Sequence, residues 1–353
     1  MTLVRLAPLL AFFATLATGA GTDGLKLGKA PLKSAGVLAF GPDGVLFVGD
    51  SVGAAIFALD TQDRASVVTK PFEVTGISEK IAAVLGSAPD QILIYDTAVN
   101  PISKNVYLSV SRGRGPDAAA VILKLDRAGK LSVLSLDSIR FASASLPNAA
   151  RGPRMEAITS IQYIGGNVIV AGLSNEEFSS NLRSIPFPFP AEGADAGAGI
   201  EIYHTSHGAY ETNAPVRTFI PLEIGTEEYI LAAYTCTPLV TIRVSDLTPG
   251  NQVTGSTIEE LGPGNRPLDM VAYRKNGHDY VLIANSARGV IRLTLDHPQT
   301  FEDLTSRPQS KVMPRLRLSE WKRVHQLKKV DDATALILTD ADGSIDLRTV
   351  ALP

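Results

Sequence analysis

The chain contains one cysteine, Cys236, among its 353 residues. One thiol cannot form an internal disulfide, so packing must supply the stability of the fold. The Cys-x-x-Cys-His motif does not occur, which excludes haem attachment through it. The Gly-x-Ser-x-Gly, His-Glu-x-x-His and P-loop patterns do not occur either.

The chain also lacks an excess of charge of either sign. It has 33 basic and 36 acidic residues and a formal net charge of -3. Nucleic-acid-binding domains normally carry a basic excess, so nucleic acid is not expected as a partner. After the N-terminus there is no run of roughly 18 apolar residues, so the mature chain should contain no membrane span. A hydrophobic content of 45% is typical of a globular protein with a large core.

The N-terminal segment, residues 1–20, has a different composition from the rest. One Arg precedes the apolar run Leu6 to Leu16, and Thr18-Gly19-Ala20 fits a signal-peptidase site. We expect cleavage near Gly21, a secreted or periplasmic location, and a single domain over residues 21–353. The alternative is an uncleaved anchor, although the apolar run is too short to span a membrane.

A repeated pattern of apolar segments runs through the chain. Each copy has an apolar segment, a turn rich in Gly, Asn or Asp, a second apolar segment that ends in small polar residues, and, in most copies, a third. The copies occupy residues 37–60, 95–126, 158–174, 216–244, 268–296 and 324–350. This pattern predicts a strand, a tight turn, a second strand, a short loop and a third strand in each full copy. A spacing of roughly 52 to 62 residues suits four-stranded blades with insertions.

The repeats predict an all-β fold, a six-bladed β-propeller. A seventh blade is the alternative if residues 61–75 or 127–150 hide a degenerate copy. The sixth copy ends with its third strand, so an N-terminal strand within residues 25–32 should complete the last blade and remove open sheet edges. One helix is expected between the first two copies, with Ser78 as N-cap and Gly86 as its stop.

The stretch "LAFGPDGVLFVGDS" resembles secreted propellers of the NHL-repeat and gluconolactonase-like types. The strings "NPISKNVYLSVSRG", "GLSNEEFSSNLRSIPFPF" and "AAYTCTPLV" are similar to those of a bacterial family of exported propellers with no assigned activity. Gluconolactonase-like enzymes hold a divalent cation with Glu and Asn/Asp ligands. That ligand set has no residue-by-residue match here, so the resemblance does not imply lactonase activity.

In a propeller, the loops between second and third strands open on one face, here called the loop face, together with the starts of the first strands. Ligands usually bind on such a face because loops on a rigid scaffold carry function. The predicted ligand-binding residues are Asp96, Arg112, Arg217, Asp269, Asn285 and Arg288. The alternatives are that Asp96 and Asp269 accept hydrogen bonds from backbone amides of neighbouring strands, and that Arg112 and Arg288 form salt bridges between blades.

A second candidate site combines "YHTSHG", which holds His204 and His207, with Cys236. If the fourth strand of the third blade ends near Tyr203, all three residues emerge on the loop face. Two imidazoles and a thiolate favour copper or zinc over calcium or magnesium. Glu211 could add a carboxylate ligand. The alternatives are histidines that cap a strand end, a buried Cys236, and a solvated Glu211.

The sequence leaves three functions open. The first is a non-enzymatic module that binds a small molecule or protein on the loop face. The second is a copper- or zinc-binding protein, in one form a redox enzyme, centred on His204, His207 and Cys236. The third is a hydrolase or lactonase with a hard divalent cation held by carboxylates at the channel mouth.

Overall fold

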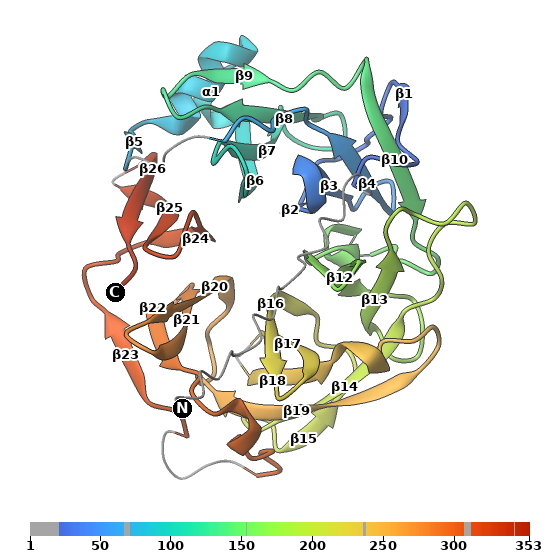
Figure 1. The fold of residues 1–353 in the computed structure, drawn as a ribbon, viewed down its shortest axis with the longest axis vertical. Helices are drawn as coiled ribbons and strands as arrows, with labels where there is room; N and C mark the ends of the chain where they lie inside the picture. The colour runs from blue at the N-terminus through green and yellow to red at the C-terminus, as the bar shows by residue number, and fades with distance from the viewer. Residues whose placement is uncertain (1–20, 67–70, 153, 236–237, 307–311, 342) are drawn as a thin grey trace, which may run out of the picture.

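The computed structural model describes residues 21–66, 71–152, 154–235, 238–306, 312–341 and 343–353. In this part of the chain, six blades surround a central axis (Figure 1), each with four antiparallel strands and one of them extended by a fifth. The chain is therefore a β-propeller, and six blades, not seven, are present among the described residues. Residues 1–20 lie outside the described residues, so the signal peptide stays a prediction.

Each sequence repeat forms the inner strands of one blade. The first strands are β2 (Leu38–Phe40), β6 (Ile92–Val99), β11 (Ser160–Ile164), β16 (Val216–Ile224), β20 (Pro267–Lys275) and β24 (Val324–Lys329). The second strands are β3 (Val45–Asp50), β7 (Val106–Arg112), β12 (Asn167–Leu173), β17 (Glu227–Tyr234), β21 (His278–Asn285) and β25 (Thr334–Ala341). The third strands are β4 (Ala55–Asp60), β8 (Ala119–Leu125), β13 (Ser180–Pro186), β18 (Pro238–Arg243), β22 (Gly289–Thr294) and β26 (Ser344–Ala351).

The fourth strands come from less regular stretches of sequence. In the order of the blades above they are β10 (Ile139–Ser145), β9 (Leu131–Val133), β14 (Ala198–His204), β19 (Gln252–Glu260), β23 (Arg315–Leu318) and β5 (Glu73–Val74). Each blade is named below by its first strand. In the β11 and β16 blades, the fourth strands β14 and β19 also pair with each other in parallel, which joins these two blades at the rim.

The blades do not follow one another around the ring in chain order. The first strand β2 contacts both β6 and β11, and β24 contacts both β20 and β6. The order around the axis is therefore β6, β2, β11, β16, β20 and β24, which Figure 1 also shows. The N-terminal strands β2, β3 and β4 lie between the β6 blade and the β11 blade. The chain then builds the β6 blade and returns to the β2 blade, where β10 adds the fourth strand.

A strand from early in the chain completes the last blade, as expected, but it is not within residues 25–32. The connection from the β2 blade to the β6 blade passes the outer edge of β26, where β5 pairs Val74 with Leu347. Residues Lys26–Gly28 form β1 instead, which pairs with β10. Both strands cover edges that would otherwise expose unpaired backbone groups.

The expected helix is α1 (Ile77–Leu85), between β5 and β6. Its N-cap is Gly76 and not Ser78, which lies inside the first turn. Gly86 ends the helix in the left-handed conformation, at φ 60°, as predicted. No helix in the described ranges is long and apolar enough to cross a membrane.

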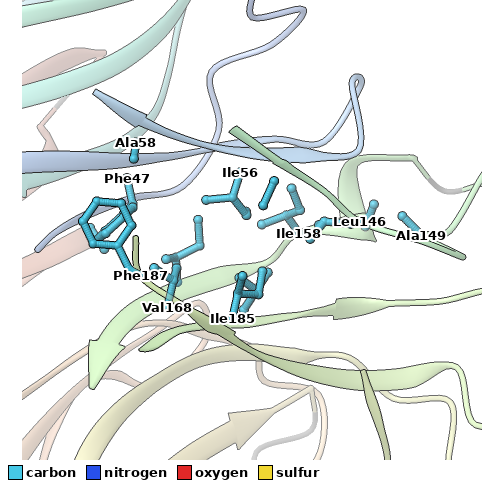
Figure 2. Packing of buried hydrophobic residues seen from close by; sticks show 14 of the residues in the cluster. Phe47, Ile56, Ala58, Leu146, Ala149, Ile158, Val168, Ile185 and Phe187 are labelled. Atoms are coloured by element: carbon cyan, nitrogen blue, oxygen red, sulfur yellow. The ribbon is translucent and has the colours of Figure 1, made fainter. Parts of the chain in front are cut away.

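Hydrophobic side chains fill the spaces between neighbouring blades. Figure 2 shows the cluster between the β2 and β11 blades, where Phe47 and Phe187 lie close together near Val168. The rings of Phe47 and Phe187 meet edge to face, with centroids 4.9 Å apart. Phe47 is fully buried. Truncation at this position would leave a cavity between two blades that the rigid sheets cannot close.

We expect Phe47→Ala to lower the free energy of unfolding by about 3–5 kcal/mol, the usual cost of removing a buried phenylalanine ring. Urea denaturation followed by the fluorescence of the single tryptophan, Trp321, measures it. Leu27→Ala is the control, because Leu27 is 66% exposed and its loss should change stability by less than about 0.5 kcal/mol. Equal effects of the two substitutions would contradict the inter-blade packing described here.

Candidate functional site

A cavity of about 360 Å³ opens where the first strands begin around the axis. Three of the six predicted ligand residues, Asp96, Arg217 and Asp269, line it. The other polar or aromatic residues of its wall are Tyr95, Thr159, Ser160, Gln162, Thr218, Arg266, His325, Gln326 and Lys328. The cavity is therefore the mouth of the central channel, as the register of the repeats predicts.

Asp96 and Asp269 both hold neighbouring blades together. Asp96 accepts a hydrogen bond from the amide of Leu38 in the β2 blade, at 2.8 Å. Asp269 accepts one from the amide of Leu327 in the β24 blade, at 2.9 Å. Each carboxylate also accepts the amide of the residue that follows it in the chain. The backbone hydrogen bonds considered as the alternative for these two residues are thus present.

Lys328, which was not among the predicted ligand residues, joins the two carboxylates. Its Nζ lies 3.0 Å from Asp96 Oδ1 and 2.9 Å from Asp269 Oδ2. These three residues, the channel clamp, belong to three adjacent blades. The repeat pattern placed Lys328 in the turn after the first apolar segment of the sixth copy, whereas it lies inside β24, where a charge is costly unless it is paired. Pairing it with the two aspartates needed the order of the blades around the ring.

Burial and charge act in opposite directions in the channel clamp. Burial lowers the pKa of Lys328, but Asp269 and Asp96 raise it by more, so the net pKa lies above the ordinary value. Burial raises the pKa of Asp269, and Asp96 adds to this, while Lys328 opposes both; the net pKa is raised. The ammonium of Lys328 therefore stays protonated at neutral pH and compensates the buried carboxylates.

The channel clamp does not favour a hard divalent cation at this position. The carboxylates of Asp96 and Asp269 converge, but the ammonium of Lys328 lies between them. All four carboxylate oxygens accept N–H donors. Calcium needs six to eight oxygen ligands and would have to displace Lys328. The channel mouth thus offers little support for a calcium- or magnesium-dependent lactonase.

Arg217 is held at the cavity wall by two partners. Its Nη1 lies 2.7 Å from Glu156 Oε1, and its Nε donates to Thr235 Oγ1 at 2.8 Å. Glu156 belongs to the segment before the β11 blade, so the ion pair links the β11 and β16 blades. Arg217 therefore presents a fixed guanidinium to the cavity.

The other three predicted ligand residues do not line this cavity. Arg112 is exposed and donates to the carbonyl of Leu85 at 3.4 Å, beside α1. The side-chain amide of Asn285 donates to the carbonyl of Ile283 at 2.9 Å. Arg288 donates to the carbonyl of Pro263 at 3.0 Å. Each side chain fastens a loop of its own blade or a neighbouring connection, so the six predicted residues form no single site.

The histidine motif forms a hairpin at the rim of the β11 blade. β14 ends at His204, and the chain returns as β15 (Ala209–Glu211), which pairs with β14. The carbonyl of His204 accepts the amides of His207, at 3.0 Å, and Gly208, at 2.9 Å. Gly208 has φ 68°, a conformation that glycine adopts without strain. The turn places His207 above His204, and the register places Glu211 on the same side as His204.

His204, His207 and Glu211 form a compact cluster. His204 Nδ1 lies 2.9 Å from Glu211 Oε2, and His207 Nδ1 contacts Glu211 Oε1. The imidazole centroids are 3.9 Å apart. One ligand atom from each residue lies within 4.8 Å of the other two. His204 is 2% exposed and His207 is 51% exposed, so the cluster reaches from the protein interior to the surface.

The surroundings of the cluster favour a carboxylate in its ionised form. Burial raises the pKa of Glu211, but hydrogen bonds from His207 and His204 lower it by more, so the net pKa lies below its ordinary value. The buried Nε2 of His204 has no hydrogen-bond partner among the described residues. Strand β14, which carries His204, is also held by Thr257 of β19, whose hydroxyl donates to the Tyr203 carbonyl at 2.7 Å.

Of the predicted metal ligands, the structure brings His204 and His207 together. Cys236 lies outside the described residues, so its predicted role as a ligand stays a prediction. Glu211, considered from sequence only as an additional ligand, is the residue that bridges the two imidazoles.

No protein-family model matches the chain, and no curated protein matches its sequence. Several solved structures are similar to it in shape. A glucose dehydrogenase is 16% identical, with a TM-score of 0.39 over 93% of this chain and 98% of the other. The PQQ-bound aldose sugar dehydrogenase of Streptomyces coelicolor is 11% identical, with a TM-score of 0.34 over 93% and 97%. A streptogramin B lyase is 13% identical, with a TM-score of 0.31 over 93% and 97%. At these values the likenesses carry no argument about activity.

The channel clamp generates a prediction about pH. Lys328→Met should lower the free energy of unfolding at pH 7 by on the order of 3 kcal/mol, because it leaves two buried carboxylates without their cation. The defect should shrink as the pH falls from 7 towards 5. Asp269 already has a raised pKa, and without Lys328 it takes up a proton more readily in the folded state than in the unfolded state.

Urea denaturation at pH 5, 6, 7 and 8 measures both effects. Lys329→Met is the matched control, because Lys329 pairs with the exposed Asp332 and its loss should cost less than about 1 kcal/mol at every pH. A defect in Lys328→Met that stays constant over this pH range would rule out a clamp that depends on charge.

Proposed function

We propose that this protein is an exported propeller that binds a first-row transition metal ion, zinc or copper, through His204, His207 and Glu211. The observation that carries the proposal is the approach of two imidazoles and one carboxylate within 4.8 Å on a single hairpin. Clusters of this kind supply the three protein ligands of many zinc sites.

The donor types support a transition metal over calcium or magnesium. Imidazole nitrogen suits zinc and copper, whereas calcium and magnesium prefer an all-oxygen set. Tetrahedral zinc with bonds near 2.0–2.1 Å would place its ligand atoms roughly 3.3 Å apart. The present spread of 4.8 Å therefore needs only small side-chain rotations to close on an ion.

The uneven burial of the cluster supports a site with an accessible side. His204 is held inside the protein, while half of His207 faces solvent. Three protein ligands with one open position are typical of catalytic zinc sites, whereas structural sites are closed by four. Cys236, if it is a ligand, would close the set and make it softer, which would favour copper or zinc held without an open position.

Metal binding to chelator-treated protein tests this proposal. We expect the wild type to bind about one equivalent of zinc or copper in isothermal titration calorimetry. His207→Ala and Glu211→Gln should each weaken binding by more than about 100-fold, because loss of a ligand should exceed the 10- to 100-fold cost of losing an outer hydrogen bond. Elemental analysis of wild type and Cys236→Ser, side by side, shows whether the thiol takes part.

His278→Ala is the matched control. His278 lies 2.5 Å from Asp296 and is 57% exposed, so it forms a histidine–carboxylate pair like that of His207 but without a second imidazole bonded to the same carboxylate. It should leave metal binding unchanged. Retention of full affinity by both His207→Ala and Glu211→Gln, or failure of the folded wild type to bind zinc and copper, would refute the proposal.

A further inference from the structure

The cavity at the channel mouth contains hydrogen-bond donors that have no acceptor among the described residues. A lysine ammonium carries three N–H donors, and the channel clamp uses two of those of Lys328. Arg266 lines the cavity, is exposed, and has no hydrogen bond or ion pair from its guanidinium to any described residue. His325, also exposed, lines the same wall. Arg217 adds a guanidinium that its partners hold in place.

The acceptors of the cavity are, by contrast, largely occupied. All four carboxylate oxygens of Asp96 and Asp269 accept backbone or ammonium donors. Gln326 is the exception, because its Oε1 is buried and has no donor among the described residues, while its Nε2 donates to the carbonyl of Tyr95 at 3.1 Å. Because the Oε1 of Gln326 is buried, the wall offers a ligand mainly N–H donors.

The charge of the wall agrees with this asymmetry. Three cationic side chains and two anionic ones line the cavity; both anions contact Lys328, and Arg217 pairs with Glu156, which lies outside the cavity wall. Arg266 is thus the one cation of the cavity wall without an anionic partner in the described part of the chain. Guanidinium groups bind carboxylate and phosphate through paired N–H donors.

We propose that the channel mouth binds a small hydroxylated organic anion, a carboxylate or a phosphate ester, with Arg266 contacting the negative group. The third N–H of Lys328 and the guanidinium of Arg217 supply further donors to the negative group and to ligand hydroxyl oxygens. The volume of about 360 Å³ lies at the lower end of the range for small-molecule sites, roughly 300–1,000 Å³. This site is separate from the histidine cluster and does not depend on a bound metal.

Three probes with the same three-carbon skeleton test the proposal: glycerate, glycerol 3-phosphate and uncharged glycerol. Binding is measured by isothermal titration calorimetry on the metal-free His207→Ala protein, so that an anion coordinated to a metal cannot mimic the result. We expect one of the two anions to bind with one equivalent and glycerol to bind at least about 10-fold more weakly. The preferred anion identifies the negative group as carboxylate or phosphate.

Arg266→Gln should weaken binding of that anion at least about 10-fold, because it removes the unpaired cation. Arg274→Gln is the matched control: Arg274 lies near the other end of β20, is 71% exposed, and does not line the cavity. Its substitution should leave the affinity unchanged. Equal binding of glycerol and the anions, equal losses in the two arginine variants, or no binding of either anion up to 10 mM, as an order of magnitude, would overturn the proposal.

Discussion

One charged side chain joins three of the blades on which the channel mouth is built. Lys328, from the β24 blade, shares its ammonium between Asp96 of the β6 blade and Asp269 of the β20 blade. The same carboxylates bind backbone amides of the next blades, so side-chain charge and main-chain position are coupled. Removing Lys328 would leave two buried carboxylates without their cation. The clamp thus holds together the junction at which the ring closes between its last blade and the β6 blade.

The two proposed sites depend on different parts of the scaffold. The channel mouth depends on the first strands and on the clamp between them. The histidine cluster depends on the rim, where the parallel pairing of β14 and β19 and the short hairpin to β15 hold His204 and Glu211. No residue is shared between the cluster and the cavity wall. A metal ion at the rim and an organic anion on the axis would therefore bind independently unless a larger movement linked them.

Local patterns predicted the blades well because each blade is built from neighbouring strands and tight turns. The six repeats, the stop of α1 at Gly86, and the end of β14 next to "HTSHG" all follow from short-range rules of alternation and turn chemistry. The same rules placed Asp96, Arg217 and Asp269 at the channel mouth. Arg112, Asn285 and Arg288 lie outside this cavity, because matching positions in different repeats do not point at the same place when loops differ in length.

The sequence by itself determined the propeller architecture, the inner strands of each blade, and the residue types at the strand ends. Only the tertiary structure decided the order of the blades, because every repeat presents a similar apolar face and nothing local specifies its neighbour. That order placed β5 instead of residues 25–32 on the last blade, and it brought Lys328 between Asp96 and Asp269. It also follows that Glu211 could be recognised as the bridge between His204 and His207 only once the hairpin register was known. Long-range pairing is a sum of many weak packing contacts, and no single residue encodes it.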